Sequence, residues 1–550
     1  MPTVTFSLKD LNSLVKKSIK ESELKDLLAY AKAELESVDK DEITVQFNDT
    51  NLPYLWSVEG LALFLRGVLG KEKGIPKIKI EKDPSYKIVV DSNLKSVRPY
   101  ISAFVAKGDK ITEYFLKQLI QMQEKFCDAY GCRREKIAIG VYPANKITFP
   151  VSYKAVPPRS IKFVPLEFMR ELDLLQILDQ HPAGKDYAWI LKGLKKFPLL
   201  MDYNKEVLSF PPIINSEKMG KLELGDKEIF FEATGTDIDS VNLAANIFAQ
   251  LFFERGFKIY SVNTGYARKP LLTPDFKIES IKIKKEDVDN ILGMDLKESE
   301  IKKLVEMARY DFSNYKITIP AIRNDVMHPV DIIEDIAIMY GYDNISSLEL
   351  ETYTYGSTFD LQKFVDKVRE ILVGVGYQET ASPVLSNKDL LFNKMNIKDF
   401  GCVEIKNYES LTYSVVRPWI IPELMDVLMR NKHVDYPQKL FEQGTVSVTK
   451  EGKILDFERV AAVACHAKAD YTEIRQALDY LFRMLGVDYD IEDTDHGSFI
   501  AGRVARISVK GKKVAFIGEI SPIVLNSFGV DMPAAAFELN LTELFEVIKK

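Results

Sequence analysis

The sequence of 550 residues has few cysteines, and none of them lies in a metal-binding pattern. Of its four cysteines, only Cys127 and Cys132 are close, five positions apart. No second pair of cysteines or histidines follows them at the spacing that zinc sites need. We therefore expect no zinc site and four reduced thiols, as in a cytoplasmic protein.

The chain also lacks a long apolar run and a secretion signal. No stretch of about 18 apolar residues is present, so we expect no membrane span. The start, MPTVTFSLKDLNSL, has no basic segment followed by an apolar one, which again predicts a cytoplasmic protein. The net charge of −6 speaks against an indiscriminate coat for nucleic acid, although local basic stretches such as 133–136 are present.

Common catalytic motifs are missing as well. There is no Walker A loop, G-x-G-x-x-G fingerprint, H-E-x-x-H, G-x-S-x-G or kinase signature. The five histidines are isolated along the sequence. Any chemistry must therefore come from smaller groups of residues.

The sequence does have the length and composition of several folded domains. Hydrophobic residues make up 46% of the chain and charged residues 28%, which is typical of proteins with real cores. The residue patterns predict a multidomain α+β fold. Its four regions are a helical and strand-like N-terminal domain at 1–92 with an amphipathic helix at 51–70, a mixed α/β domain at 93–266, a small α+β module at 273–347, and a mixed or antiparallel sheet with helices at 353–550.

Acidic residues gather beside a run of isoleucines in RNDVMHPVDIIEDIAIMYGYDNI. Pro329 suits the first position of a helix. Asp331, Glu334 and Asp335 would then share one face, with Asp325 just ahead of the helix. Two interpretations remain open here: acids that complement the helix dipole, each worth roughly 0.3–1 kcal/mol, or oxygen ligands for Mg²⁺.

A second group lies in the strand-like stretch FFEATGTD. Alternation along a strand puts Glu232 and Thr234 on the same face, beside a glycine turn. They are either walls of a pocket or the solvent side of an edge strand. His181, in the turn HPAGKDY, is either functional or simply a turn residue.

Taken together and in order, several segments resemble the β subunit of phenylalanyl-tRNA synthetase of the archaeal/eukaryotic type. They include LPYLWSVEGLALFLRG, VPLEFMRELDLLQILDQHPAGKDYAWIL, VLSFPPIINSEKMGKL, FFEATGTD, IPAIRNDVMHPVDIIEDIAIMYGYDNI, YPQKLFEQGTV and GRVARISVKGKKVAFIGEISPIVL. The sequence departs from the family pattern at QEKFC, GCRRE, GVYPAN and VRPWIIPEL.

The resemblance implies an architecture and a partner. The mixed domain at 93–266 would be a tRNA-editing domain, 273–347 a module of DNA-binding-like fold, and 353–550 a domain like the core of class II synthetases. The family works as an (αβ)₂ heterotetramer in which the α subunit joins phenylalanine to tRNA(Phe) with ATP. The resemblance also implies a Mg²⁺ site at the four acidic positions, Asp325, Asp331, Glu334 and Asp335.

The resemblance further implies proofreading. A pocket built for phenylalanine cannot strongly reject tyrosine, with comparable discrimination of about 10², so a second site should hydrolyse mischarged Tyr-tRNA(Phe). A buried acceptor should recognise the extra hydroxyl, and Glu232 fits this role. The candidate lining residues are Glu232, Thr234, Leu200, Ser209, Asn215 and His181.

The C-terminal region lacks arginines for an ATP site. Its end reads PAAAFELNLTELFEVIKK, without the arginine that class II active sites place on phosphates. Arg417 and Glu442 are interpreted as relics of a substrate-binding strand. We therefore predict that the chain alone does not charge tRNA. The alternative is a non-catalytic scaffold that binds nucleic acid.

Overall fold

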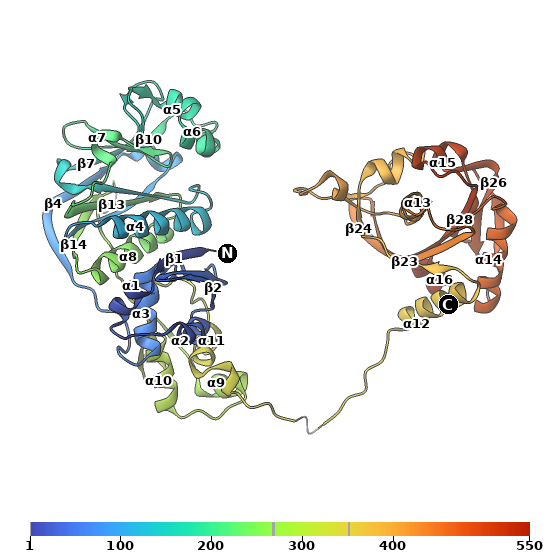
Figure 1. The fold of residues 1–550 in the computed structure, drawn as a ribbon, viewed down its shortest axis with the longest axis horizontal. Helices are drawn as coiled ribbons and strands as arrows, with labels where there is room; N and C mark the ends of the chain where they lie inside the picture. The colour runs from blue at the N-terminus through green and yellow to red at the C-terminus, as the bar shows by residue number, and fades with distance from the viewer. Residues whose placement is uncertain (1, 267–269, 350–351, 550) are drawn as a thin grey trace. The chain divides into compact units, whose positions relative to one another are not determined.

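The computed structural model describes residues 2–266, 270–349 and 352–549. The chain forms two compact units, residues 1–348 and 349–550 (Figure 1). Each unit contains its own sheets and its own buried cores. None of the helices in the described part of the chain is long and apolar enough to span a membrane.

The first unit begins with a three-stranded antiparallel sheet and three helices. The strands pair in the order β1-β3-β2. Helix α1 packs against α3. The elements are β1 Thr3–Ser7, α1 Leu8–Val15, α2 Glu21–Tyr30, β2 Ala33–Asp39, β3 Glu42–Phe47, the 3-10 turn η1 Pro53–Leu55 and α3 Val58–Val68.

Helix α3 differs from the prediction. The stretch 51–70 was expected to be one amphipathic helix, but it divides into η1 and α3, and α3 is buried on all sides. Its Arg66 pairs with Glu254 at 2.7 Å, and its Glu59 pairs with Arg255 at 2.6 Å. Buried charges are tolerated when they are paired. Because the partners lie 188 and 196 positions away in the chain, periodicity alone could not reveal this burial.

A ten-stranded mixed sheet forms the middle of the first unit. Its order is β12-β11-β10-β7-β4-β14-β5-β13-β6, with β15 paired to β14. Strand β4 pairs in parallel with β7 and β14, although it precedes residue 93, where the mixed domain was predicted to begin. The bounds are β4 Ile80–Val90, β5 Tyr100–Lys107, β6 Ile137–Pro143, β7 Val151–Val156, β10 Phe197–Met201, β11 Val207–Phe210, β12 Ile214–Asn215, β13 Glu228–Gly235, β14 Lys258–Gly265 and β15 Pro270–Thr273.

The two ends of this sheet approach each other. Strand β6 is last at one end, and β11 is second from the other end. Nevertheless, the Tyr142 hydroxyl oxygen on β6 lies 2.8 Å from Ser209 Oγ on β11. The sheet is therefore strongly curled, as large twisted sheets commonly are.

Helices and short turns complete this domain. Helix α8 (Ile238–Glu254) packs on β5, β13 and β14. Helix α4 (Glu113–Lys125) continues into the π-helical turn η3 (Phe126–Tyr130), and α4 and α8 both lie below the sheet in Figure 1. The remaining elements are η2 Ser92–Ser96, η4 Ala144–Lys146, β8 Lys162–Phe163, β9 Leu172–Asp173, α5 Leu174–Gln180, α6 Pro182–Tyr187, η5 Ala188–Leu191 and α7 Glu217–Gly220.

The small α+β module follows in the same unit. Its strands pair antiparallel in the order β16-β18-β17. The predicted helix start at Pro329 is confirmed, and Ile332, Ile333 and Ile336 on this helix are buried. The elements are β16 Glu279–Lys282, α9 Lys285–Leu292, α10 Glu298–Met307, β17 Asp311–Ser313, β18 Lys316–Ile319, α11 Pro329–Tyr340 and η6 Tyr342–Asn344.

The second unit contains a seven-stranded sheet with helices on both faces. The order is β19-β23-β24-β28-β27-β26-β25, and only β19 pairs in parallel. Helices α12, α14 and α16 share one core, and α13 and α15 share the other. The main elements are α12 Asp360–Gly374, β19 Gln378–Glu379, α13 Ile421–Arg430, β23 Gln438–Lys450, β24 Lys453–Cys465, α14 Tyr471–Leu485, β25 Asp490–Asp493, β26 Phe499–Val509, β27 Lys512–Ile520, α15 Pro522–Phe528, β28 Ala534–Asn540 and α16 Leu541–Lys549.

A smaller sheet of short strands accompanies it. These strands pair antiparallel in the order β20-β22-β21. The elements are β20 Leu385–Ser386, η7 Asp389–Asn393, β21 Val403–Glu404, η8 Leu411–Tyr413 and β22 Val415–Val416. The expected architecture of this region was a mixed or antiparallel sheet with helices, and the observed sheet is mixed through the parallel pairing of β19 with β23.

Candidate functional site

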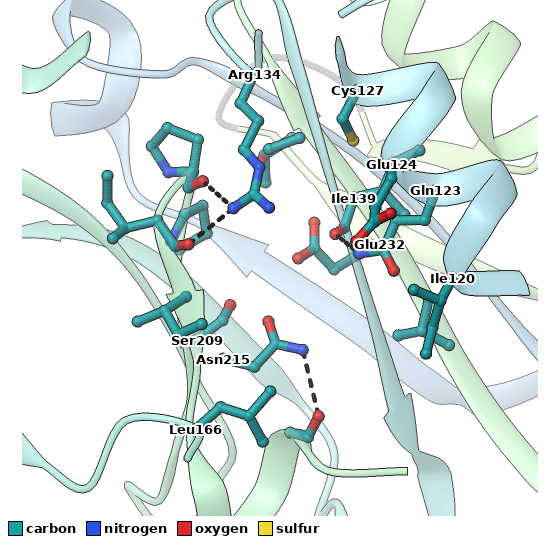
Figure 2. Close-up of a pocket in the computed structure, with 18 of the residues that line it drawn as sticks. Ile120, Gln123, Glu124, Cys127, Arg134, Ile139, Leu166, Ser209, Asn215 and Glu232 are labelled. Atoms are coloured by element: carbon teal, nitrogen blue, oxygen red, sulfur yellow. Dashed lines mark hydrogen bonds between the residues drawn. The ribbon is translucent and has the colours of Figure 1, made fainter. Parts of the chain in front are cut away.

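A cavity of about 720 Å³ lies between the two ends of the large sheet. Its lining comes from α4 and η3, from β6 and β13, and from the β11–β12 segment. Four of the predicted residues line it: Glu232, Thr234, Ser209 and Asn215. Figure 2 shows Glu232 on one side of the cavity and Ser209 and Asn215 on the other.

Glu232 projects from an interior strand. Strand β13 lies between β5 and β6, so the alternative of an exposed edge strand is wrong. Glu232 and Thr234 both line the cavity, which confirms the predicted alternation. Glu232 is only 2% exposed.

The two carboxylate oxygens of Glu232 differ in their surroundings. Oε1 accepts a hydrogen bond from the Tyr142 hydroxyl at 2.8 Å. Oε2 is buried and has no hydrogen-bond partner. Burial raises the pKa of this carboxyl to about 7, against the opposing effects of the Tyr142 hydrogen bond and the positive charge of Arg98. An unpaired buried acceptor is costly, so its persistence points to a missing donor.

A buried arginine stands behind this wall. Arg98 donates from Nε to Thr234 Oγ1 at 3.1 Å and from Nη2 to the Thr234 carbonyl at 2.7 Å. Its Nη1 donates to the Glu135 carbonyl at 2.9 Å. Burial lowers the pKa of Arg98. The guanidinium therefore holds Thr234 in place and adds positive potential near Glu232.

The opposite wall is tied down by a second arginine. Arg134 Nη1 donates to the Ile213 carbonyl at 2.9 Å, and its guanidinium lies 4.2 Å from the centre of the Tyr187 ring. Asn215 Nδ2 donates to the Gly220 carbonyl at 3.3 Å. Both interactions fix the short segment that carries the polar side chains of this wall.

Two of the predicted residues do not line the cavity. Leu200 is fully buried in the core of the domain, where its backbone pairs with Ser209. His181 is buried and caps α6, with Nδ1 accepting from the Ala183 N–H at 3.1 Å. Its Nε2 lies 3.1 Å from the Leu166 carbonyl, so Nε2 carries the proton. His181 thus supports the wall from behind.

The cavity offers an acceptor but no evident nucleophile. None of the described residues that line it is a histidine. Burial raises the pKa of the Cys127 thiol to about 11, so this side chain stays protonated and unreactive at neutral pH. The arrangement is suited to recognising a hydroxyl donor within an otherwise apolar group.

Comparisons with known proteins identify the family. A family model described as phenylalanyl tRNA synthetase beta chain CLM domain matches residues 347–541, and one described as tRNA synthetase B5 domain matches residues 281–342. The phenylalanine–tRNA ligase beta subunit of Thermococcus sibiricus is 39% identical over 557 residues, which cover 99% of each chain. The chain belongs to the phenylalanine–tRNA ligase beta subunit family.

Other relatives agree with this assignment. The phenylalanine–tRNA ligase beta subunit of Pyrococcus abyssi is 39% identical, over 99% of this chain and 100% of its own length. A crystal structure of an N-terminal fragment of the phenylalanyl-tRNA synthetase beta subunit from Pyrococcus horikoshii superposes with a TM-score of 0.60. That fragment is 37% identical and covers 62% of this chain and 100% of its own.

The four acids that the family resemblance assigned to Mg²⁺ have other partners in this structure. Arg323 pairs with both Asp325 and Asp335, and Asp335 also accepts from the Tyr310 hydroxyl. The remaining two acids are also engaged: Asp331 accepts from the N–H groups of Met327 and His328 at 2.7 Å each, and Glu334 pairs with Lys32 at 2.8 Å.

This arrangement does not fit an ion held by all four carboxylates. An ion would have to displace Arg323, whose charge stabilises two of them. Among the described residues, the four acids do not form a group of three or more ligand atoms within 4.8 Å. Members of the phenylalanine–tRNA ligase family use Mg²⁺, but a Mg²⁺ site at these acids stays a prediction.

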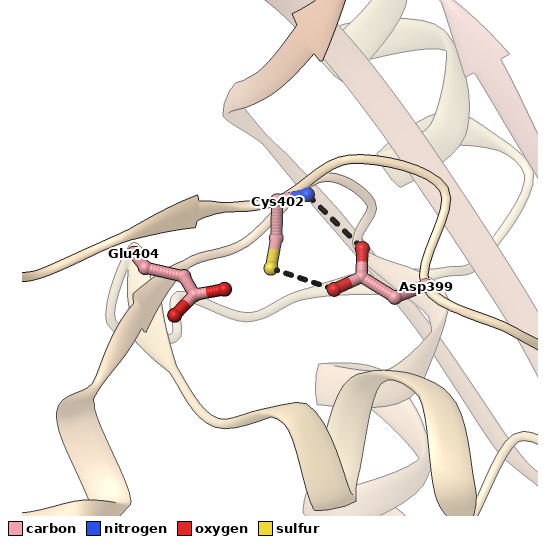
Figure 3. A group of neighbouring side chains, drawn as sticks. All are labelled: Asp399, Cys402 and Glu404. Carbon is pink, nitrogen blue, oxygen red and sulfur yellow. Dashed lines mark hydrogen bonds between the residues drawn. The ribbon is translucent and has the colours of Figure 1, made fainter.

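Elsewhere in the described part of the chain, one cluster has suitable atoms for a metal. Asp399, Cys402 and Glu404 place their ligand atoms within 4.8 Å of one another (Figure 3). Lys388 Nζ, however, lies 3.0 Å from Asp399 and 2.7 Å from Glu404. Burial and the neighbouring Asp399 raise the pKa of the Cys402 thiol to about 11. The lysine already pairs with both acids, so this cluster is explained as an ion-pair network.

In the second unit, the predicted relic residues meet. Arg417 Nη1 pairs with Glu442, and both side chains are 2% exposed. Ser382 Oγ accepts from Arg417 at 2.9 Å and is 2.8 Å from Glu442 Oε2. Arg417 therefore has its charge balanced inside the chain and is not free to bind phosphate.

Tyr142 is the site residue that sequence reasoning missed. It lies in IAIGVYP, whose mostly apolar residues are typical of a buried strand with a core tyrosine. Its partner Ser209 is 67 positions away, and only the curl of the sheet brings the two together. The available signal was Gly140, a glycine inside a strand, which often marks a close approach.

Proposed function

We propose that this chain is the β subunit of a phenylalanine–tRNA ligase and that its Glu232 cavity hydrolyses Tyr-tRNA(Phe). The observation that carries the proposal is the bare Oε2 of Glu232 in a cavity of about 720 Å³. Family membership supports an α-type partner that attaches phenylalanine to tRNA, and we propose an (αβ)₂ assembly. The cytoplasm is where this reaction is needed.

The acceptor explains how the correct product is spared. Tyrosine brings a hydroxyl that donates to Oε2, whereas phenylalanine leaves the oxygen both desolvated and unpaired. An unsatisfied buried group costs roughly 1–3 kcal/mol and more when it is charged. Each 1.4 kcal/mol corresponds to a tenfold difference in binding. The cavity should therefore prefer the tyrosyl ester by roughly tenfold or more.

The chain's own residues orient the substrate more than they attack it. Glu232 binds the tyrosyl hydroxyl, far from the ester bond at the other end of the amino acid. With the Cys127 thiol protonated and no histidine among the described lining residues, we propose that a bound water attacks the ester. The terminal hydroxyl of the tRNA would assist this step.

The test is an aminoacylation assay with the assembled enzyme. We expect Glu232→Ala to leave Phe-tRNA formation nearly intact, while Tyr-tRNA accumulates when tyrosine is supplied. Glu228→Ala is the matched control, because Glu228 begins the same strand, pairs with Lys107 at 3.1 Å and lies outside the cavity. Clearance of Tyr-tRNA at the parental rate by Glu232→Ala would show that the pocket is misplaced.

A further inference from the structure

We propose that Tyr142 is a positioning residue that occupies Oε1 of Glu232 and thereby presents Oε2 alone to the substrate. This inference rests on the proposed editing function of the cavity. The Tyr142 hydroxyl oxygen lies 2.8 Å from Glu232 Oε1 and 2.8 Å from Ser209 Oγ. Tyr142 is fully buried, and its hydroxyl contacts Glu232 on one wall and Ser209 on the other.

The direction of these hydrogen bonds follows from the number of protons. An ionised carboxylate only accepts, so Tyr142 must donate its single hydroxyl proton to Glu232. The same hydroxyl also reaches Ser209 Oγ at 2.8 Å, so Ser209 and Glu232 compete for its one proton. The Tyr142 hydroxyl lies between Ser209 Oγ and Glu232 Oε1, and neither contact involves Oε2. Since no described residue donates to Oε2, our proposal assigns the donor to the ligand.

The backbone opposite Glu232 is shaped for this contact. Gly140 pairs with Glu232 across β6 and β13. A Cβ atom on Gly140 would lie 2.1 Å from the Tyr142 hydroxyl oxygen and 2.4 Å from Glu232 Oε1. Any residue other than glycine would push these two groups apart. The contact between Tyr142 and Glu232 therefore depends on the glycine at position 140 of β6.

The Tyr142 hydrogen bond also controls the charge of Glu232. Burial raises the pKa of Glu232 to about 7, and the bond from Tyr142 is the largest influence that opposes this rise. Arg98, just before β5, is the other charged group that acts on Glu232. The Glu232 charge in turn raises the pKa values of Cys127 in η3 and Tyr153 on β7, which both stay protonated where Glu232 titrates. The other charged or titratable groups that line the cavity are Glu124, Lys125, Asp128, Arg134, Glu167, Tyr187 and Lys221.

Loss of the phenol should therefore change how hydrolysis depends on pH. Without Tyr142's hydroxyl, Glu232 holds its proton to higher pH, and a protonated carboxyl is a poorer acceptor for a tyrosyl hydroxyl. Selective hydrolysis should then begin at a higher pH than in the parent. A role limited to packing would lower activity without moving the pH profile.

The experiment measures hydrolysis of preformed Tyr-tRNA by the assembled enzyme between pH 6 and 9. Spontaneous ester hydrolysis is subtracted at each pH. We expect Tyr142→Phe to hydrolyse Tyr-tRNA roughly tenfold or more slowly than the parent at pH 7. Part of this lost rate should return at pH 9. Tyr153→Phe is the matched control, since its buried hydroxyl donates to the Arg98 carbonyl at 2.8 Å without touching Glu232. It should keep the parental profile.

Gly140→Ala supplies a second variant that keeps every hydrogen-bonding group but separates Tyr142 from Glu232. It should reproduce the pH profile of Tyr142→Phe. If Tyr142→Phe does not fold, the pH profile of Gly140→Ala tests the role of Tyr142 in its place. A parental profile in the folded variants, together with an inactive Glu232→Ala, would overturn the role of Tyr142 alone. Full activity of Glu232→Ala would instead overturn the proposed function of the cavity.

Discussion

Two buried carboxylates show how differently an acid can be used in one unit. Asp335 is satisfied by Arg323 and by the Tyr310 hydroxyl. Glu232 has a donor on Oε1 only, and its second oxygen is bare. A satisfied buried acid serves the fold, whereas one left half satisfied in a cavity is suited to a ligand.

The first prediction at the residue scale concerns the acidic helix. Asp335→Asn should lower the stability of the first unit by roughly 3 kcal/mol, because it breaks a buried ion pair and leaves the buried Arg323 with Asp325 as its remaining carboxylate partner. Asp331→Asn should cost about 1 kcal/mol, as expected for a helix cap. Thermal melts with Mg²⁺ and with chelator measure both.

The same melts also test the metal hypothesis. We expect equal melting temperatures with Mg²⁺ and with chelator if these acids serve only the fold. A melting temperature that falls on chelation in the parent, and no longer does so in Asp331→Asn, would establish the Mg²⁺ site instead.

A second prediction at this scale is a pH dependence of stability. Because the folded-state pKa of Glu232 is about 7, above its ordinary value of 4.5, the folded state holds this proton more tightly. The contribution to stability is fully present below pH 4.5 and is lost as the pH rises through 7, by about 3 kcal/mol at most. Glu232→Gln should remove this loss, so its advantage over the parent in chemical denaturation should grow between pH 5 and pH 8. An equal difference at both pH values would contradict the assignment.

At the scale of elements, patterns within a segment were predictable and contacts between segments were not. Alternation placed Glu232 and Thr234 on one face, and Pro329 marked the start of α11. Whether β13 is an edge or an interior strand depends on β5 and β6, which lie far away in the sequence. The contact between Asp335 and Tyr310 likewise could not be predicted from the local pattern, since Tyr310 lies 25 positions before Asp335.

The site was therefore predictable in part. The family resemblance supplied Ser209 and Asn215, and the curled sheet gathers both with Glu232. It also supplied Leu200 and His181, which lie behind the walls. Sequence patterns could not separate a residue that lines a cavity from one that supports its wall, because both are buried and close together in the chain.

His181 provides the prediction at this scale. His181→Ala should destabilise the α5–α6 region by roughly 1–2 kcal/mol, because it removes the cap of α6 and the hydrogen bond to Leu166. The ratio of Tyr-tRNA to Phe-tRNA hydrolysis should stay at the parental value. Denaturation and hydrolysis assays measure the two effects, with the exposed His433→Ala as control. If His181→Ala lowered the ratio of Tyr-tRNA to Phe-tRNA hydrolysis without any loss of stability, His181 would have to contact the substrate.

At the scale of the whole molecule, recognition and charging are expected to reside in different chains. The second unit has the sheet and helices of a large domain, but its buried Arg417 is balanced by Glu442. Arg459 likewise pairs with Glu538 at 3.0 Å. Phosphates need cations that are free to bind them, and these two are committed within the fold.

We accordingly predict that the purified chain forms no Phe-tRNA from phenylalanine, ATP and tRNA(Phe). Addition of the α-type subunit should restore charging. Incorporation of labelled phenylalanine into tRNA measures this, with the complex as the positive control. Robust charging by the chain in the absence of any α subunit would refute the division of labour.

The most direct measurement compares the hydrolysis of preformed Tyr-tRNA(Phe) and Phe-tRNA(Phe) by the assembled enzyme and by its Glu232→Ala variant. The parent should hydrolyse the tyrosyl ester faster by roughly tenfold or more, because only tyrosine satisfies Oε2 of Glu232. In the variant the ratio should fall to about one. An unchanged ratio would contradict the assignment of this carboxylate as the group that recognises tyrosine.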